Sequence, residues 1–206
     1  ETVARLREAG GEVKWASQAF SLSHIKTILV VRSVALIMTL NLTRSSFEGN
    51  RDFGVVTTVP EDAAMAQAVF DADWNGRELD ATGSLVVSPE NSRQRLIDLI
   101  DSAEAALEVY AEVIRDDEVV AAFLAAESRG VEVEIVLTED ADPVNRRILE
   151  TLVAGGVTLL VVDEPYIHAK MVLADDERAY VGSQNFTETS LDENRELGIV
   201  LSEPAP

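Results

Sequence analysis

Apolar runs and apolar helical stripes alternate along the second part of the chain, from residue 84 to about residue 162. The spacing predicts strands at 85–88, 107–113, 131–138 and 157–162, and helices at 92–106, 116–128 and 143–154. This alternation is typical of an α/β structure in which helices flank a largely parallel sheet. Further apolar strands follow one another closely after residue 166, so part of that sheet is expected to be antiparallel.

The first part of the chain is richer in strand-like patterns. Apolar runs predict strands at 13–16, 24–31, 34–40 and 53–59, and helical spacing predicts helices at 1–9 and 61–74. Residues 75–83, NGRELDATG, are polar and contain glycine near both ends, which is typical of a linker. The chain is therefore predicted to contain two domains, residues 1–74 and 84–203, joined by this linker.

Two copies of the pattern H-x-K use residue types that are scarce in this chain. His24 and Lys26 form the first copy and His168 and Lys170 the second, in a chain with only two histidines and three lysines. Residues two apart in a strand point to the same face, so each copy places an imidazole beside an ammonium group. An imidazole can attack phosphorus or transfer a proton near neutral pH, and an ammonium group can neutralise a phosphoryl oxygen. The two copies are therefore candidates for phosphate chemistry.

Further polar residues follow the second H-x-K in a fixed order. They are Asp175, the G-S-x-N sequence that contains Gly182, Ser183 and Asn185, and Glu196. H-x-K-x4-D, then G-S-x-N, then an acidic residue, resembles the HKD signature of the phospholipase D superfamily. The resemblance implies α-β-α domains and one active site built from two such motifs.

An internal duplication supplies the second motif. A shift of 144 residues places His24, Lys26, Asn41, Asn50, Arg51 and Asp52 on His168, Lys170, Asn185, Asn194, Arg195 and Glu196. The first copy departs from the motif at Val31, which stands for Asp175, and at Met38-Thr39, which stand for Gly182-Ser183. By the same offset the counterpart of residues 84–145 would precede Glu1. The first domain is therefore expected to be incomplete at its N-terminus.

The side chains predict a mechanism that needs neither a metal nor a cofactor. One imidazole attacks phosphorus to form a phosphohistidine, the other protonates the leaving alcohol, and water or an acceptor alcohol then attacks. Lys26, Lys170, Asn41 and Asn185 would neutralise and orient the phosphate oxygens.

The family resemblance adds roles to individual residues. It implies that an acidic residue 28 positions after each histidine hydrogen-bonds the catalytic imidazole, which assigns Asp52 to His24 and Glu196 to His168. It also implies that His24 is the nucleophile and His168 the acid, and that Asp175 is structural. Tyr110 and Glu112, at the end of a predicted strand, are further candidates to line the pocket.

Composition narrows the classes of partner. The chain has 37 acidic and 17 basic residues, a formal net charge of −20, and no cysteine. This charge argues against indiscriminate nucleic-acid binding, and the lack of cysteine excludes disulfides and thiolate metal sites. No apolar segment of this chain approaches the length of a membrane span, and peripheral membrane contact is left open.

Three functions fit these residues. The first is a phospholipase D-like phosphodiesterase or phosphatidyltransferase that acts on phospholipids, cardiolipin synthase activity included, and the tandem motifs favour it. The second is a nuclease of the same superfamily, which would need a basic groove. The third is a non-catalytic binding protein with a decayed first motif, suggested by Val31, by Met38-Thr39 and by the expected missing start of the first domain. An exported or cell-envelope location is favoured although no signal is visible, and the head group, the acceptor and the oligomeric state are left open.

Overall fold

The computed structural model describes residues 1–30, 33–139 and 142–202. In chain order the elements are α1 (Thr2–Glu8), β1 (Thr27–Val30), β2 (Val34–Met38), α2 (Arg44–Glu48), β3 (Asn50–Arg51), β4 (Gly54–Thr57), α3 (Pro60–Asn75), β5 (Leu85–Ser88), α4 (Ser92–Asp101), β6 (Ala106–Ala111), α5 (Asp117–Arg129), β7 (Glu132–Thr138), α6 (Pro143–Ala154), β8 (Thr158–Val162), β9 (Tyr166–Ile167), β10 (Lys170–Ala174), β11 (Arg178–Gly182), the π-helix η1 (Thr189–Glu193) and β12 (Glu196–Leu201).

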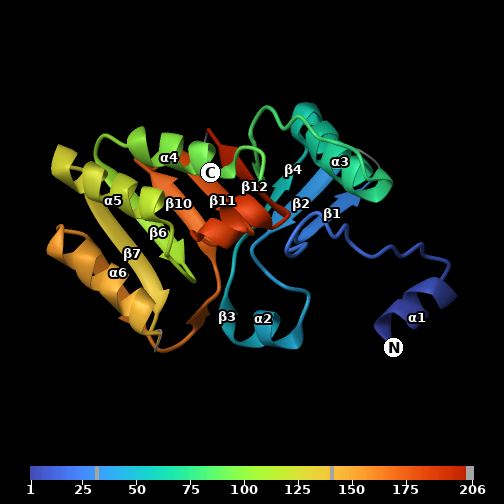
Figure 1. Cartoon of the computed structure of the whole chain (residues 1–206), viewed down its shortest axis with the longest axis horizontal. Helices are drawn as coiled ribbons and strands as arrows, with labels where there is room; N and C mark the ends of the chain where they lie inside the picture. Colours follow the sequence, from blue (N-terminus) through green and yellow to red (C-terminus); the bar gives the residue numbers. More distant parts are fainter. Residues whose placement is uncertain (31–32, 140–141, 203–206) are drawn as a thin grey trace.

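A seven-stranded mixed sheet forms the centre of the second half of the chain (Figure 1), in the order β5-β12-β11-β10-β6-β7-β8. Strands β6, β7 and β8 pair in parallel, and the other neighbours pair antiparallel. The sheet is mixed as predicted, but the expectation that it is largely parallel is wrong. A short turn joins β10 to β11, which suits antiparallel pairing, whereas α5 and α6 connect the parallel strands.

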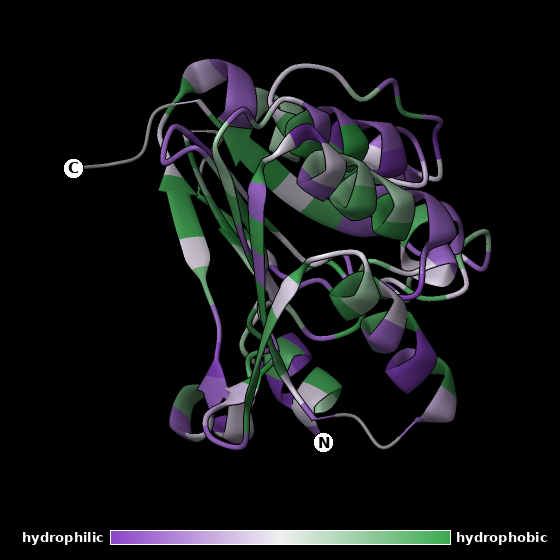
Figure 2. Ribbon diagram, turned by 90° about the vertical axis from the view of Figure 1, so that its left-hand side faces the viewer, coloured by the Kyte–Doolittle hydropathy of each residue, from purple (hydrophilic) through white to green (hydrophobic). Residues whose placement is uncertain are grey.

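Helices α4, α5 and α6 cover this sheet and bury its main core. Their apolar faces meet the strands through residues such as Leu96, Phe123 and Leu152, which are fully buried. Figure 2 shows the apolar strands beneath helices whose colouring is mixed. Helices α5 and α6 match the predicted helices to within one residue. Helix α4 ends at Asp101, earlier than predicted, because the backbone N–H groups of the next turn bind Asp175.

A second core joins the two halves of the chain. Strands β1, β2 and β4 form a three-stranded antiparallel sheet, on which α3 packs. Ala66 and Val69 of α3 lie in one apolar cluster with Ile37 of β2 and with Val87 and Leu197 of the larger sheet. The short sheet of the first half is therefore packed against β5 and β12 of the second half.

The N-terminal residues follow the predictions only in part. Helix α1 forms where expected, with none of its residues buried. The predicted strand at 13–16 is wrong, because that segment lies along α3 instead of pairing with a strand. There Lys14 Nζ donates to the carbonyl oxygen of Trp74 at 2.8 Å and lies 4.5 Å from the centre of the Trp74 ring. No helix of the described residues is both long and apolar enough to cross a bilayer.

Candidate active site

Both histidines are held at Nδ1 by a carboxylate. His24 Nδ1 lies 2.8 Å from Glu196 Oε2, and His168 Nδ1 lies 2.8 Å from Asp52 Oδ1. Each acid comes from the other copy of the repeat, so the pairing expected from the 28-residue spacing is wrong. With Nδ1 bound to a carboxylate, Nε2 is the nitrogen left to each ring for chemistry on a substrate.

Two parallel backbone bridges cause this crosswise pairing. Ser23 bridges to Arg195, and β3 pairs with β9 so that Arg51 lies opposite Ile167. His24 N donates to the carbonyl oxygen of Arg195 at 2.8 Å, and His168 N donates to that of Arg51 at 3.2 Å. The two bridges are related by the 144-residue offset. Each histidine and each acid directly follows a bridged residue, so each bridge sets an imidazole beside the acid of the other copy.

Other donors fix the two acids. Thr39 Oγ1 donates to Asp52 Oδ1 at 2.6 Å, while Ser190 Oγ and Asn194 Nδ2 donate to Glu196 Oε1 at 2.7 and 3.1 Å. Burial raises the pKa of both carboxyl groups, but the hydrogen bonds from the histidines and these donors outweigh it and hold each pKa below its usual value. Both acids are therefore charged partners for an imidazolium.

The hydroxyl groups of Ser183 and of its first-half counterpart Thr39 bond to the backbone directly after the two acids. Ser183 Oγ accepts from Leu197 N at 3.0 Å, and Thr39 Oγ1 accepts from Phe53 N at 2.9 Å, which are equivalent bonds in the two copies. The exchange of serine for threonine thus preserves the local hydrogen bond. Gly182 is required by packing, since a Cβ there would come within 2.6 Å of Gly198 Cα on the neighbouring strand.

The two lysines fold back towards their own histidines. Lys26 Nζ donates to the carbonyl oxygen of His24 at 2.8 Å, and Lys170 Nζ donates to that of His168. Burial lowers the pKa of Lys26 to about 8, with Glu196 opposing and Lys170 adding to the shift. Burial also lowers the pKa of Lys170, against the charge of Glu112, whose Oε2 lies 2.6 Å from Nζ. The lysines of both copies therefore act in one electrostatic site.

The motif asparagines differ in their contacts. Asn41 Nδ2 lies 3.4 Å from His168 Nε2, so a side chain of the first half reaches the reactive nitrogen of the second. Asn185 is anchored by its backbone N–H, which donates to Ser190 Oγ at 2.9 Å. Its Oδ1 is buried and bonds to no group of the described residues.

Asp175 lies outside this cluster and organises the backbone. Its carboxylate accepts the N–H groups of Glu104, Ala105 and Ala106 at 2.8–2.9 Å, just before β6 begins. The hydrogen bond from Ala106 leads the causes that hold the pKa of Asp175 below its usual value. Val31, its counterpart in the repeat, lies outside the described residues.

Motif reasoning did not assign several residues of the site. They are Thr39, Tyr166, Ser190 and Asn194, while Glu112 was a candidate to line the pocket without an assigned partner. Glu112 follows β6, whose Ala111 lies opposite Lys170 on β10. The strand register brings Glu112 to Lys170 across 58 positions, and no short motif records that register. The predicted pocket residue Tyr110 packs edge-on against Phe53 of the first half, with ring centres 5.3 Å apart.

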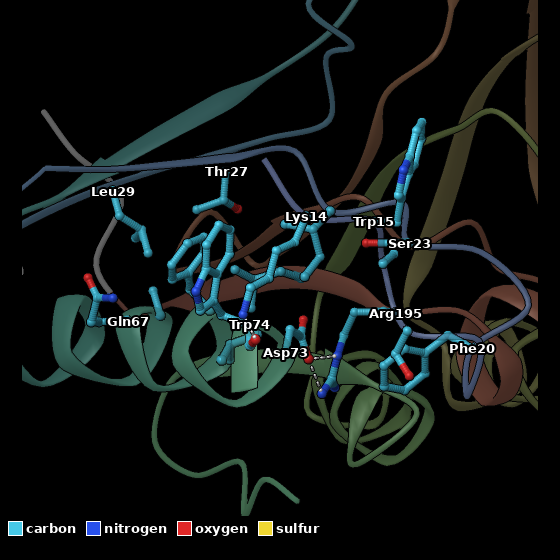
Figure 3. Close-up of a pocket in the computed structure, with 17 residues that line it drawn as sticks. Lys14, Trp15, Phe20, Ser23, Thr27, Leu29, Gln67, Asp73, Trp74 and Arg195 are labelled. Carbon is cyan, nitrogen blue, oxygen red and sulfur yellow. Dashed lines mark hydrogen bonds and ion pairs between the residues drawn. The ribbon is translucent and has the colours of Figure 1, made fainter. Parts of the chain in front are cut away.

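A cavity of about 440 Å³ lies between α3 and the segment that leads into β1 (Figure 3). Ser23, Ile25, Arg195 and Leu197 line it, and they alternate with His24 and Glu196 along extended chain. Alternate residues of extended chain point to opposite sides, so the cavity and the imidazoles lie on different faces. In its lining, the guanidinium of Arg195 is already bound to Asp73 and to Glu90. The cavity is therefore separate from the paired histidines.

No group of His, Asp and Glu within the described ranges is arranged to hold a metal ion. The sequence matches the family described as "Cardiolipin synthase, PLD-like domain" over residues 1–74 and 96–205. The chain belongs to the phospholipase D superfamily. The match covers both copies of the repeat, in agreement with the paired site.

Individual relatives agree with this membership. Phospholipase D Y from Dictyostelium discoideum is 35% identical over 86 residues, which are 39% of this chain and 20% of that protein. The chain thus spans about a fifth of the length of this curated relative. Nuc from Salmonella typhimurium, a phospholipase D family member, shares 25% identity at a TM-score of 0.54, covering 58% of this chain and 81% of Nuc. Polyphosphate kinase from Porphyromonas gingivalis has a similar fold at 16% identity and a TM-score of 0.73, covering 98% of this chain and 34% of the kinase.

Proposed function

We propose that this chain is a phospholipase D-like phosphodiesterase or phosphatidyltransferase that acts on phospholipids through a phosphohistidine. The observation that carries the proposal is the crosswise pairing of His24 with Glu196 and of His168 with Asp52. A decayed binding protein would have no need of two equivalent imidazole–carboxylate pairs. The pairs also link the two halves of the repeat, which supports a single site that uses both histidines.

In the first step His24 Nε2 attacks phosphorus, an N–P bond forms and the P–O bond to the leaving alcohol breaks. His168, protonated, gives its proton to that alcohol. Two carboxylates lie beside His168, since Asp52 Oδ1 is 2.8 Å from its Nδ1 and Glu112 Oε2 is 3.9 Å from its Nε2. In the second step His168 takes a proton from water or an acceptor alcohol, whose oxygen bonds to phosphorus as the N–P bond breaks. Lys26 and Lys170 offset the charge on the phosphate oxygens.

Phospholipid is favoured over nucleic acid by the charges around the histidines. Within the described residues, no arginine side chain bonds to either imidazole or to Asp52 or Glu196. Arg195, the arginine next to Glu196, is 2% exposed and is bound to Asp73 and Glu90 on the side of the cavity. A nuclease would need cations converging on this site for a polyanionic backbone.

Trapping of the phosphohistidine tests the proposal. Because the chain has two histidines, each His→Ala variant leaves a single candidate nucleophile. A phosphodiester with a p-nitrophenol leaving group needs no acid, so His168→Ala should still form an adduct on His24, detected by intact mass after rapid quenching. His24→Ala should form none. Release of head group from phosphatidylglycerol vesicles, compared with cleavage of an oligonucleotide, then tests the substrate class. Absence of any adduct in the wild-type chain and both variants would remove the enzymatic proposal.

A further inference from the structure

A third carboxylate, Glu112, lies at the reactive face of His168. Its Oε2 is 2.6 Å from Lys170 Nζ and 3.9 Å from His168 Nε2, and its Oε1 accepts the hydroxyl of Tyr166 at 3.0 Å. Burial raises the pKa of Glu112, but the Lys170 ammonium outweighs it, so the pKa stays below its usual value. Glu112 is therefore a fixed negative charge inside the site.

The position of this charge bears on any phosphate that reacts at His168. Asp52 occupies Nδ1 of the imidazole, so a phosphate must approach Nε2. A phosphate oxygen that contacts His168 Nε2 would lie close to Glu112 Oε2, which is 3.9 Å from that nitrogen. The carboxylate repels such an oxygen, and the repulsion grows in proportion to the charge of the ligand.

The proposed reaction changes that charge. A phosphodiester carries one negative charge. Hydrolysis turns it into a phosphomonoester, which loses a second proton near pH 6 and so approaches a charge of −2 at neutral pH. A fixed carboxylate beside the phosphate therefore distinguishes product from substrate, although both have the same phosphoryl core.

We propose that Glu112 is a specificity-determining residue that admits monoanionic phosphodiesters and rejects dianionic phosphomonoesters, including the hydrolysis product. This inference rests on the proposed function, because it takes the paired histidines as the phosphate site. It assigns Glu112 a role distinct from those of Asp52 and Glu196, which hold the imidazoles at Nδ1. Lys26 and Lys170 supply the attraction that both ligand classes share, and Glu112 supplies the difference.

Equilibrium binding to the whole chain tests the proposal at pH 7.5, with inorganic phosphate as the dianion probe and dimethyl phosphate as the monoanion probe. Glu112→Gln preserves the shape and can still hydrogen-bond to Lys170 and Tyr166, but it removes the charge. The repulsive free energy is proportional to the charge of the ligand. The factor by which Glu112→Gln raises the affinity for phosphate should therefore be about the square of the factor for dimethyl phosphate. Roughly tenfold tighter phosphate binding would accompany about threefold tighter diester binding.

Glu108→Gln is the matched control, since Glu108 lies on β6, the strand that directly precedes Glu112, with an exposed side chain and should leave both affinities unchanged. Glu112→Ala, which also removes the charge, provides a second variant if the glutamine variant fails to fold by circular dichroism. If Glu112 only positions Lys170, the glutamine variant would leave both affinities unchanged or weaken them together, and the proposal is overturned. A gain in phosphate affinity without a phosphohistidine would instead support Glu112 while removing the enzymatic proposal.

Discussion

His24 Nδ1 lies 2.8 Å from Glu196 Oε2, although the two residues are 172 positions apart and belong to different copies of the repeat. The equivalent contact joins His168 to Asp52 across 116 positions. Each imidazole–carboxylate pair is therefore shared between the halves of the chain. A change in one half should disable the histidine of the other.

Double-mutant cycles test this sharing. We expect Glu196→Gln and Asp52→Asn each to lower the rate about 100-fold, because an imidazole without its carboxylate loses orientation and stabilisation of its charged form. Glu196→Gln should be strongly non-additive with His24→Ala and close to additive with His168→Ala. The readouts are phosphohistidine formation and hydrolysis of the p-nitrophenyl diester. Coupling within each repeat, rather than across them, would contradict the geometry.

The pH dependence of activity should report Lys26. Its pKa is lowered to about 8 in the folded chain from an ordinary 10.5, so the ammonium group loses its proton as the pH rises through 8. We expect the rate to fall above about pH 8, because a neutral amine cannot offset the charge on the phosphate oxygens. Lys26→Arg, which stays charged, should have low activity without this alkaline limb. An unchanged limb in that variant would assign the titration to another group.

The same pKa predicts an opposite effect on stability. Since the folded pKa of Lys26 lies below the unfolded one, the unfolded chain binds more protons between about pH 8 and 10.5, and this group makes stability rise with pH over that range. Lys26→Met should therefore stabilise the fold at pH 7 by about 1–3 kcal/mol while it abolishes activity. Urea unfolding at pH 7 and pH 10 measures this, with the exposed Lys14→Met as control. Loss of stability at pH 7 would contradict the prediction.

The fold of the second half could largely be predicted from sequence, because its apolar periods are long and regular. Helices α5 and α6 and strands β5, β7 and β8 lie within one residue of their expected bounds. The paired H-x-K residues could also be found, since duplication repeats them at a constant offset. The crosswise dyads could not, because spacing along the chain does not say which copy supplies the acid. Glu112 could be named as a candidate to line the pocket, but its contact with Lys170 could not be predicted, because strand register alone brings the two together.

Asp175 should contribute to folding rather than to chemistry. Asp175→Asn keeps the size of the side chain but loses the charge that accepts the N–H groups of Glu104, Ala105 and Ala106. We expect a loss of about 1–2 kcal/mol in the free energy of unfolding at pH 7. Because the folded pKa of Asp175 is depressed, this contribution is present above the unfolded pKa and fades as pH falls through the folded one. Asp176→Asn, at the exposed neighbouring position, is the control and should change little.

Arg195 should be the arginine on which the packing of the two halves depends most. Its guanidinium is almost fully buried, binds Asp73 of α3 at 2.7 Å and Glu90 at 2.7 Å, and lies 4.4 Å from the centre of the Phe20 ring. Arg195→Met would leave these carboxylates without their cation and should cost about 3–5 kcal/mol in unfolding free energy, measured by urea denaturation. Adding Asp73→Asn and Glu90→Gln to that variant should recover part of the loss. Arg44→Met, which breaks an exposed pair with Glu48, should cost less than about 1 kcal/mol. If the two arginine variants were equally stable, the buried cluster would not join the halves.

Because the backbone of Arg195 binds His24 and Glu196 follows directly, the Arg195→Met variant should also lose His24-dependent adduct formation while still folded.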